Sequence, residues 1–245
     1  MLVGTSPLNP YRLSRHVMED PVRSIWSSRD RSLSLLKSDL SQENHFLEEL
    51  FFLVDDLLRG FPPVGHSAIG TIAALLLLKA RRFALASYDM ALCCMGQEAG
   101  AMIRLLQEAW ELLIYFRQDP GRVQNVFTNT LPTAGGVAKT IDAQFKHLRE
   151  YFNEHASHLS LSAPAIHHLV NWRDLELNLD YEPSSRVLGT NIAVLFSLLF
   201  IAATEACQIL ADLDPTAADP FVARMEEIRE RSYPTFSQYG KRLPS

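Results

Sequence analysis

The histidines of this chain are concentrated in one short segment. Five of the eight, His147, His155, His158, His167 and His168, lie between residues 147 and 168. Imidazole is the side chain whose ordinary pKa places its charge change near neutral pH, and it is also the commonest metal ligand. Acid–base chemistry or metal binding is therefore expected first in this segment.

Residues 145–159 read as an amphipathic helix when they are placed at about 100° per residue. Apolar side chains form a narrow stripe that must face a core, and Arg149 lies at one edge of it. Polar groups at such an edge are partly desolvated, which is a setting in which pKa values shift. The opposite edge carries His147, Tyr151, Glu154, His155 and His158.

Three interpretations of these polar side chains are open. In the first, they form an ordinary helix flank whose groups are satisfied by neighbours or by water. In the second, His155 and His158 bind a metal ion with Glu154 beside them, because their spacing puts two imidazoles within reach of one ion. The chain has no His-Glu-x-x-His motif, so a further ligand would have to come from residues 160–168. In the third, an arginine holds an RNA phosphate while an imidazole moves the proton of the 2′-hydroxyl, without a metal.

The segment Arg149-Glu-Tyr-Phe-Asn-Glu-His155 separates an arginine from a histidine by five residues. It resembles the Arg-x(4–6)-His motif of the HEPN superfamily (higher eukaryotes and prokaryotes nucleotide-binding). The resemblance implies a helical bundle with ribonuclease activity, of the kind found in toxin–antitoxin and antiviral systems, and an active site shared by a homodimer. It gives phosphate binding to Arg149, proton transfer to His155 and an orienting role to Tyr151. Glu150 departs from the Asn, His or Asp that often follows the arginine, and its carboxylate weakens anion binding.

The stretch Ala99–Pro120 resembles a helix of a HEPN-related group of prokaryotic proteins, with the pattern Ala…Leu-Arg-x-x-x-Glu…Tyr…Asp-Pro. Arg104 and Glu108 take the arginine and glutamate positions of that pattern. Residues four apart on a helix form ion pairs worth a few tenths of a kcal/mol, which is the interpretation that the spacing favours. In the alternative, Arg104 faces the histidine helix and adds positive charge to its site.

A later segment resembles the same group through its pattern Tyr…Ser…His. Tyr151, Ser157 and His158 match it, so His158 instead of His155 takes the histidine position in this alignment. The resemblance covers about residues 66–210. It implies that Ser157 supports the site together with Arg104 and Glu108.

Composition limits the class of protein. Hydrophobic residues make up 47% and charged residues 21% of the chain, which is typical of a soluble globular protein. The formal charge of −5 argues against a general polyanion binder and leaves open a local basic patch. Three cysteines without a pairing pattern and the absence of a secretory signal predict a cytoplasmic location. RNA, a second copy of the chain or a protein such as an antitoxin are the expected partners, and neither a cofactor nor a membrane is expected.

Helical periodicity dominates the chain, which predicts an all-α fold: a single bundle of about six to eight helices. The bundle is expected over residues 21–232, between an irregular arm (1–20) and a tail (233–245). The charge-free run Val187–Thr204 just reaches the length of a membrane span. Asn191 inside it and Glu205 directly after it favour a highly apolar central helix instead.

The periodic segments and their end signals give the expected positions of the helices. Residues 175–181 alternate as a strand does, but without an expected partner they are interpreted as an extended loop. The basic cluster Lys79–Arg82 is interpreted as a solvated helix face and not as a binding site. The expected helices cover about 21–40, 41–60, 67–95, 97–118, 122–129, 137–159, 186–213 and 220–231.

Overall fold

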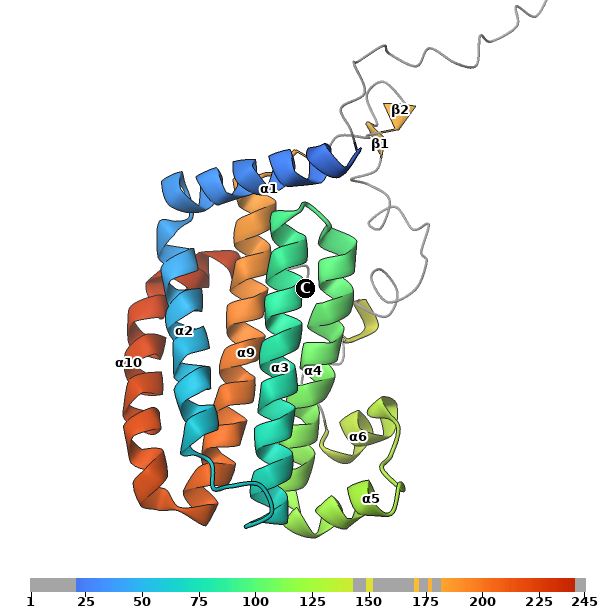
Figure 1. Cartoon of the computed structure of the whole chain (residues 1–245), viewed down its shortest axis with the longest axis vertical. Coiled ribbons are helices and arrows are strands. Elements are labelled where there is room, and N and C mark those ends of the chain that lie inside the picture. The colour runs from blue at the N-terminus through green and yellow to red at the C-terminus, as the bar shows by residue number, and fades with distance from the viewer. Residues whose placement is uncertain (1–20, 143–148, 152–169, 172–175, 178–181, 241–245) are drawn as a thin grey trace, which may run out of the picture.

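The computed structural model of the chain describes residues 21–142, 149–151, 170–171, 176–177 and 182–240. They form an all-α bundle, which confirms the expected fold class (Figure 1). The long helices are α1 (Pro21–Ser38), α2 (Ser41–Gly60), α3 (Ala68–Leu92), α4 (Gly96–Gln118), α9 (Ser185–Leu213) and α10 (Pro215–Gly240). The short helices that follow α4 are η1 (Pro120–Val123), α5 (Gln124–Phe127) and α6 (Ala134–Thr140).

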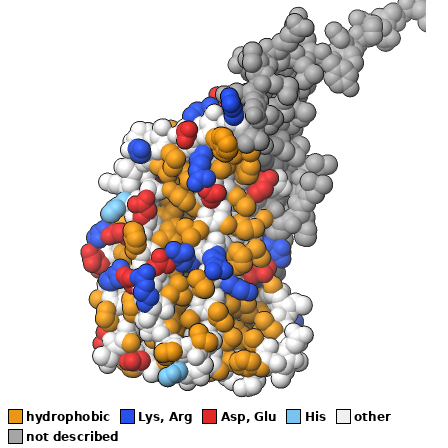
Figure 2. Space-filling view, in the orientation of Figure 1, with side chains coloured by type: hydrophobic (Ala, Val, Ile, Leu, Met, Phe, Trp, Pro, Cys, Tyr) orange, Lys and Arg blue, Asp and Glu red, His pale blue; other side chains and the backbone are white. Residues whose placement is uncertain are grey.

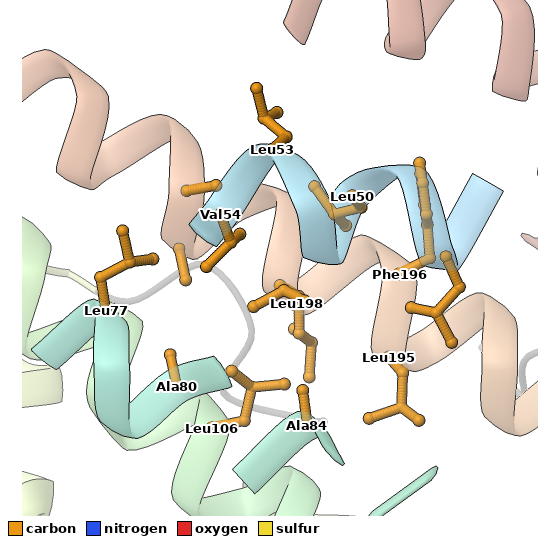
Figure 3. Packing of buried hydrophobic residues seen from close by; sticks show 14 of the residues in the cluster. Leu50, Leu53, Val54, Leu77, Ala80, Ala84, Leu106, Leu195, Phe196 and Leu198 are labelled. Atoms are coloured by element: carbon orange, nitrogen blue, oxygen red, sulfur yellow. The ribbon is translucent and has the colours of Figure 1, made fainter. Parts of the chain in front are cut away.

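The helix α9 is the expected apolar helix at the centre of the bundle. It packs against α2, α3, α4 and α10, while α1 lies across one end of the bundle (Figure 1). Figure 3 shows Leu195 and Leu198 of α9 among side chains of α2, α3 and α4. Fully burying one such leucine contributes about 1.5–3 kcal/mol, so this core holds the bundle together. By length and composition, α9 is also the one helix in the described part of the chain that could cross a bilayer.

Small residues on α3 let α4 and α9 approach it closely. Ala73, Ala80 and Ala84 are all buried on the face of α3 that meets these helices. Ser67 caps the start of α3, accepting a hydrogen bond from the backbone N–H of Gly70 at 3.2 Å. Close packing of α3 on α4 fixes the position of α4, which carries the charged side chains described below.

The prediction of one helix over residues 137–159 is wrong in its first part, where a short separate helix begins earlier and ends early. α6 begins at Ala134, where the Thr133 side chain accepts from the N–H of Gly136, and it ends at Thr140. Asp142 follows with φ of +50°, a left-handed conformation that ends the helix and that aspartate tolerates better than most residues. Residues 149–151 are helical again.

The helix expected over residues 220–231 is longer at both ends. Asp214 caps α10 by accepting from the N–H of Ala217 at 3.0 Å, so Pro215, and not Pro220, occupies the first turn. The helix then runs through part of the expected tail to Gly240. Its last part turns across behind α2 toward α9, where Tyr239 is buried (Figure 1).

Residues expected to form an extended loop are partly paired. β1 (Val170–Asn171) and β2 (Glu176–Leu177) form a two-residue antiparallel ladder, in which Val170 lies opposite Leu177. The interpretation of residues 175–181 as an unpartnered loop is therefore wrong at Glu176 and Leu177. The partner strand was missed because two residues give no periodicity.

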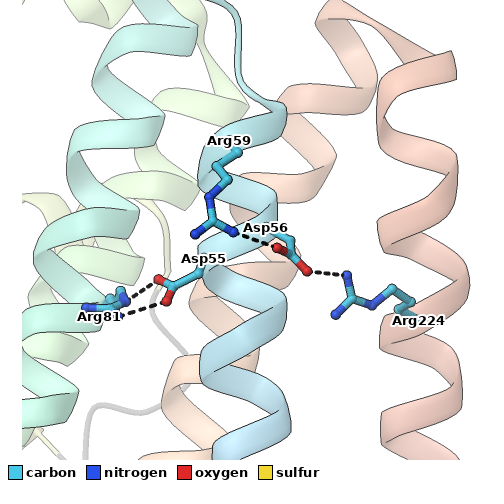
Figure 4. A network of polar contacts seen from close by, with 5 residues as sticks. All are labelled: Asp55, Asp56, Arg59, Arg81 and Arg224. Atoms are coloured by element: carbon cyan, nitrogen blue, oxygen red, sulfur yellow. Dashed lines mark hydrogen bonds and ion pairs between the residues drawn. The ribbon is translucent and has the colours of Figure 1, made fainter.

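The side chains of the basic cluster Lys79–Arg82 on α3 have two different environments. Lys79 and Arg82 are exposed, as expected, and Figure 2 shows basic and acidic side chains in a band across this face. Arg81 instead holds Asp55 of α2 through two contacts (Figure 4). A partly exposed ion pair contributes about 0–1 kcal/mol to the free energy of unfolding. The Arg81–Asp55 pair therefore orients α3 and α2 more than it stabilises them.

The neighbouring carboxylate on α2 links that helix to α10. Asp56 accepts hydrogen bonds from Arg224 and from Arg59, each at 2.8 Å (Figure 4). The hydrogen bond from Arg224 is the main reason why the pKa of Asp56 lies below its ordinary value. This surface therefore carries paired charges of both signs.

Candidate functional site

A stripe of polar side chains runs along α4, with spacings of three and four residues that place them on one face. It consists of Arg104, Gln107, Glu108 and Glu111. Gln107 and Glu111 are each 1% exposed, and the side-chain N–H of Gln107 donates to Oε1 of Glu111 at 3.1 Å. A buried carboxylate needs such partners, because an unpaired buried charge is strongly unfavourable.

Arg149 supplies the main partner of that carboxylate. It lies in the helical residues 149–151, is 9% exposed, and forms an ion pair with Glu111. Burial lowers the pKa of Arg149, the charge of Glu108 raises it, and the charge of Arg104 lowers it. Arg149 is thus desolvated and lies within the electrostatic reach of all the charged groups of the α4 stripe.

Of the two interpretations of Arg104 and Glu108, the structure confirms the intrahelical ion pair, while the role of Arg104 at a histidine site stays a prediction. The expected intrahelical ion pair is confirmed, with Nη2 of Arg104 3.1 Å from Oε1 of Glu108. Arg104 also acts on the pKa of Arg149, so its charge reaches the segment in which the catalytic residues were predicted. The side chains of Arg104 and Glu108 are 30% and 25% exposed, so this pair lies at the outer edge of the cluster.

A small cavity adjoins the two carboxylates. It has a volume of about 190 Å³ and lies between α4 and the segment 131–137. Charged side chains beside a cleft are the usual setting of a binding or catalytic site. The cavity is lined by Glu108, Glu111, Leu112, Leu131, Pro132, Ala134 and Val137.

Several predicted site residues are not among the described members of the cluster formed by Arg149 and the α4 stripe. Tyr151 lies two residues after Arg149 and is 44% exposed. Outside the described residues lie Ser157, His155 and His158, and with them the alternative metal ligand Glu154. Within the described ranges, no group of three His, Cys, Asp or Glu side chains could hold a metal ion. The structure therefore brings Arg149 together with Arg104 and Glu108, and the histidine roles stay predictions.

Gln107 and Glu111 are the members of the cluster that sequence reasoning missed. The available signal was spacing, because Arg104, Glu108 and Glu111 follow each other by four and three residues on a helix with an apolar stripe elsewhere. A polar stripe of that spacing predicts a second packing face. The sequence pattern does not show that this face packs against Arg149, because that contact depends on the tertiary fold.

The cluster holds the buried guanidinium of Arg149 in place. Arginine has five N–H donors, and the Nε of Arg149 has no hydrogen-bond partner among the residues that the structure describes. Two arginines and two glutamates leave the cluster formally neutral, so anion binding here depends on donor geometry and not on net charge. No protein-family model, no curated protein and no solved structure matches this chain.

Proposed function

We propose that this chain is an HEPN-like protein that binds RNA and cleaves it without a metal, at the cluster of Arg149 and the α4 stripe. One observation carries the proposal: Arg149 is buried on Glu111, beside a cavity and the Arg104–Glu108 pair. Buried ion pairs add little stability compared with apolar residues of similar volume. A functional reason for keeping them is therefore favoured, and perturbed charges beside a cleft point the same way.

The proposed chemistry assigns one task to each group. Arg149, oriented by Glu111, donates N–H bonds to the oxygens of the scissile phosphate, and low local dielectric strengthens them. His155 or His158 takes the proton of the 2′-hydroxyl, whose oxygen attacks phosphorus. The 5′-oxygen leaves with a proton from an imidazolium, giving a 2′,3′-cyclic phosphate and a 5′-hydroxyl. No cofactor is required, because RNA supplies its own nucleophile.

A second candidate function is a helical interaction module that binds a second copy of the chain or a protein partner. The observation that favours it is the pairing itself, since the Glu111 carboxylate already neutralises the charge of Arg149. In this case the pair fixes the packing of the residue 149–151 turn on α4. The two candidates differ in whether removing the pair abolishes an activity or only changes stability.

The test is incubation of the purified chain with total RNA, in parallel with and without EDTA. Arg149→Ala alone leaves Glu111 buried and unpaired, which costs about 3–5 kcal/mol and endangers the fold. The variant is therefore Arg149→Met with Glu111→Leu, which removes both charges. Its matched control is Arg117→Met with Glu205→Leu, which removes the ion pair between α4 and α9, whose closest atoms are 2.6 Å apart.

Cleavage by the wild type and by the control, with loss in the Arg149 and Glu111 double variant and in His155→Ala or His158→Ala, supports the nuclease. Intact RNA with every folded protein, both with and without EDTA, overturns it and favours the interaction module. Cleavage that EDTA abolishes overturns the metal-free mechanism and favours a metal at Glu154, His155 and His158.

A further inference from the structure

The cavity beside α4 has a volume and a lining that suit a nucleobase. Its volume of about 190 Å³ is below the roughly 300–1,000 Å³ of pockets for drug-sized ligands, so it suits a single flat ring system. Aliphatic side chains pack well against the faces of such rings. The apolar part of the lining consists of Leu112, Leu131, Pro132, Ala134 and Val137.

Among the residues that the structure describes, the polar side chains that line the cavity are those of Glu108 and Glu111. An ionised carboxylate has about four acceptor sites and no donor. Glu111 is engaged by Arg149 and Gln107 and is 1% exposed. Glu108 is paired with Arg104, but its side chain is 25% exposed, so of the two carboxylates it is the more accessible to a ligand.

A carboxylate on the wall of such a cavity distinguishes guanine from the other bases. Guanine presents two adjacent donors on its Watson–Crick edge, N1–H and the N2 amino group, which match the two oxygens of one carboxylate. Adenine and cytosine place a ring-nitrogen acceptor next to their amino group, and uracil places its N3–H between two carbonyl acceptors. Those acceptors would face the carboxylate and repel it.

We propose that the cavity binds a guanine base and that Glu108 recognises it. The inference rests on the proposed function in one respect: if RNA is cleaved at Arg149, the nucleotide next to the scissile phosphate is expected to be a guanosine. Binding of the base itself does not require cleavage, so the two proposals can fail separately.

The experiment measures binding of the four ribonucleosides to the full chain by calorimetry. Nucleosides carry no phosphate, so their binding tests the cavity apart from Arg149. We expect guanosine to bind about tenfold tighter than adenosine, cytidine or uridine, in line with the discrimination of a bidentate base contact. Glu108→Gln should lose that preference, while Glu98→Gln, at an exposed residue in the first turn of α4, should keep it.

A second variant guards against an effect of Glu108 on folding. Ala134→Leu fills the cavity, so it should abolish guanosine binding while leaving the melting temperature unchanged or higher. Equal binding of the four nucleosides, or guanosine binding that survives both Glu108→Gln and Ala134→Leu, overturns the inference. RNA cleavage without a guanosine preference overturns it too and leaves the nuclease standing. Guanosine-selective binding without cleavage supports the pocket and counts against the nuclease alone.

Discussion

The carboxylate of Glu111 holds the guanidinium of Arg149, and both side chains are almost completely buried. The proposed function assigns Arg149 to the phosphate of RNA, whereas the fold gives it a carboxylate as its charged partner. These roles are compatible if Glu111 engages one part of the guanidinium and orients the rest. Substitution can distinguish the two roles, because loss of a structural ion pair changes stability, whereas loss of an oriented catalytic group also changes activity.

The first prediction concerns the stability of this pair. Glu111→Leu alone leaves the charge of Arg149 buried without its partner, and we expect a loss of about 3–5 kcal/mol in the free energy of unfolding. Glu111→Leu with Arg149→Met removes both charges and should recover most of that loss. Urea unfolding of the two single variants and the double variant closes a double-mutant cycle. Additive effects would show that the two charges are not coupled.

The second prediction concerns the close approach of α10 to α9. A Cβ atom at Gly189 would lie 2.5 Å from the hydroxyl oxygen of Tyr239. That hydroxyl donates to Oε1 of Glu43 at 2.9 Å, and Glu43 is only 6% exposed. Gly189→Ala must displace Tyr239 and break this hydrogen bond, at an expected cost of about 1–3 kcal/mol by thermal or urea unfolding.

A Tyr239→Ala background supplies the control for the glycine. There the added methyl group would meet the end of the flexible Leu40 side chain, whose Cδ2 lies 3.1 Å away and can shift, and alanine is favoured over glycine in a helix by about 1 kcal/mol. Gly189→Ala should therefore stabilise the protein in that background and destabilise the wild type. The same sign in both backgrounds would mean that contact with Tyr239 is not the cause.

The third prediction tests the central position of α9. Leu199 is completely buried, while Val187 in the same helix is 57% exposed. Leu199→Ala should cost about 2–5 kcal/mol, and Val187→Ala should change the free energy of unfolding by no more than about 0.5 kcal/mol. Denaturant unfolding of the two variants measures the difference. Similar effects of both substitutions would contradict the packing of α9 between its neighbours.

The long helices could be predicted from the sequence because each carries an apolar stripe over many turns and a clear end signal. The predicted helix bounds are wrong where the end of a helix depends on one or two residues. Pro220 was taken for the first turn of the last helix, although Asp214 and Pro215 provide the cap. The end of α6 near Asp142 has neither glycine nor proline to mark it, because the break depends on one left-handed residue.

Less of the candidate site could be predicted. The Arg104–Glu108 pair follows from spacing within one helix, and the sequence predicted it. The Arg149–Glu111 pair joins segments that are distant in the sequence, so it depends on how the 149–151 turn packs on α4. Periodicity marks a polar face, but it does not identify the partner of that face.

The last prediction concerns pH. Tyr88 of α3 donates its hydroxyl hydrogen to Asn44 of α2, and burial is the main reason why its pKa is raised to about 12, with the charge of Glu48 adding to the effect and that of Arg29 opposing it. A tyrosine in the unfolded chain titrates near pH 10, so the folded state holds this proton more tightly. The resulting stability is fully present below about pH 10 and is lost as the pH rises toward 12. Unfolding experiments over this range should show the free-energy difference between wild type and Tyr88→Phe shrinking with pH. A difference that stays constant would contradict the raised pKa.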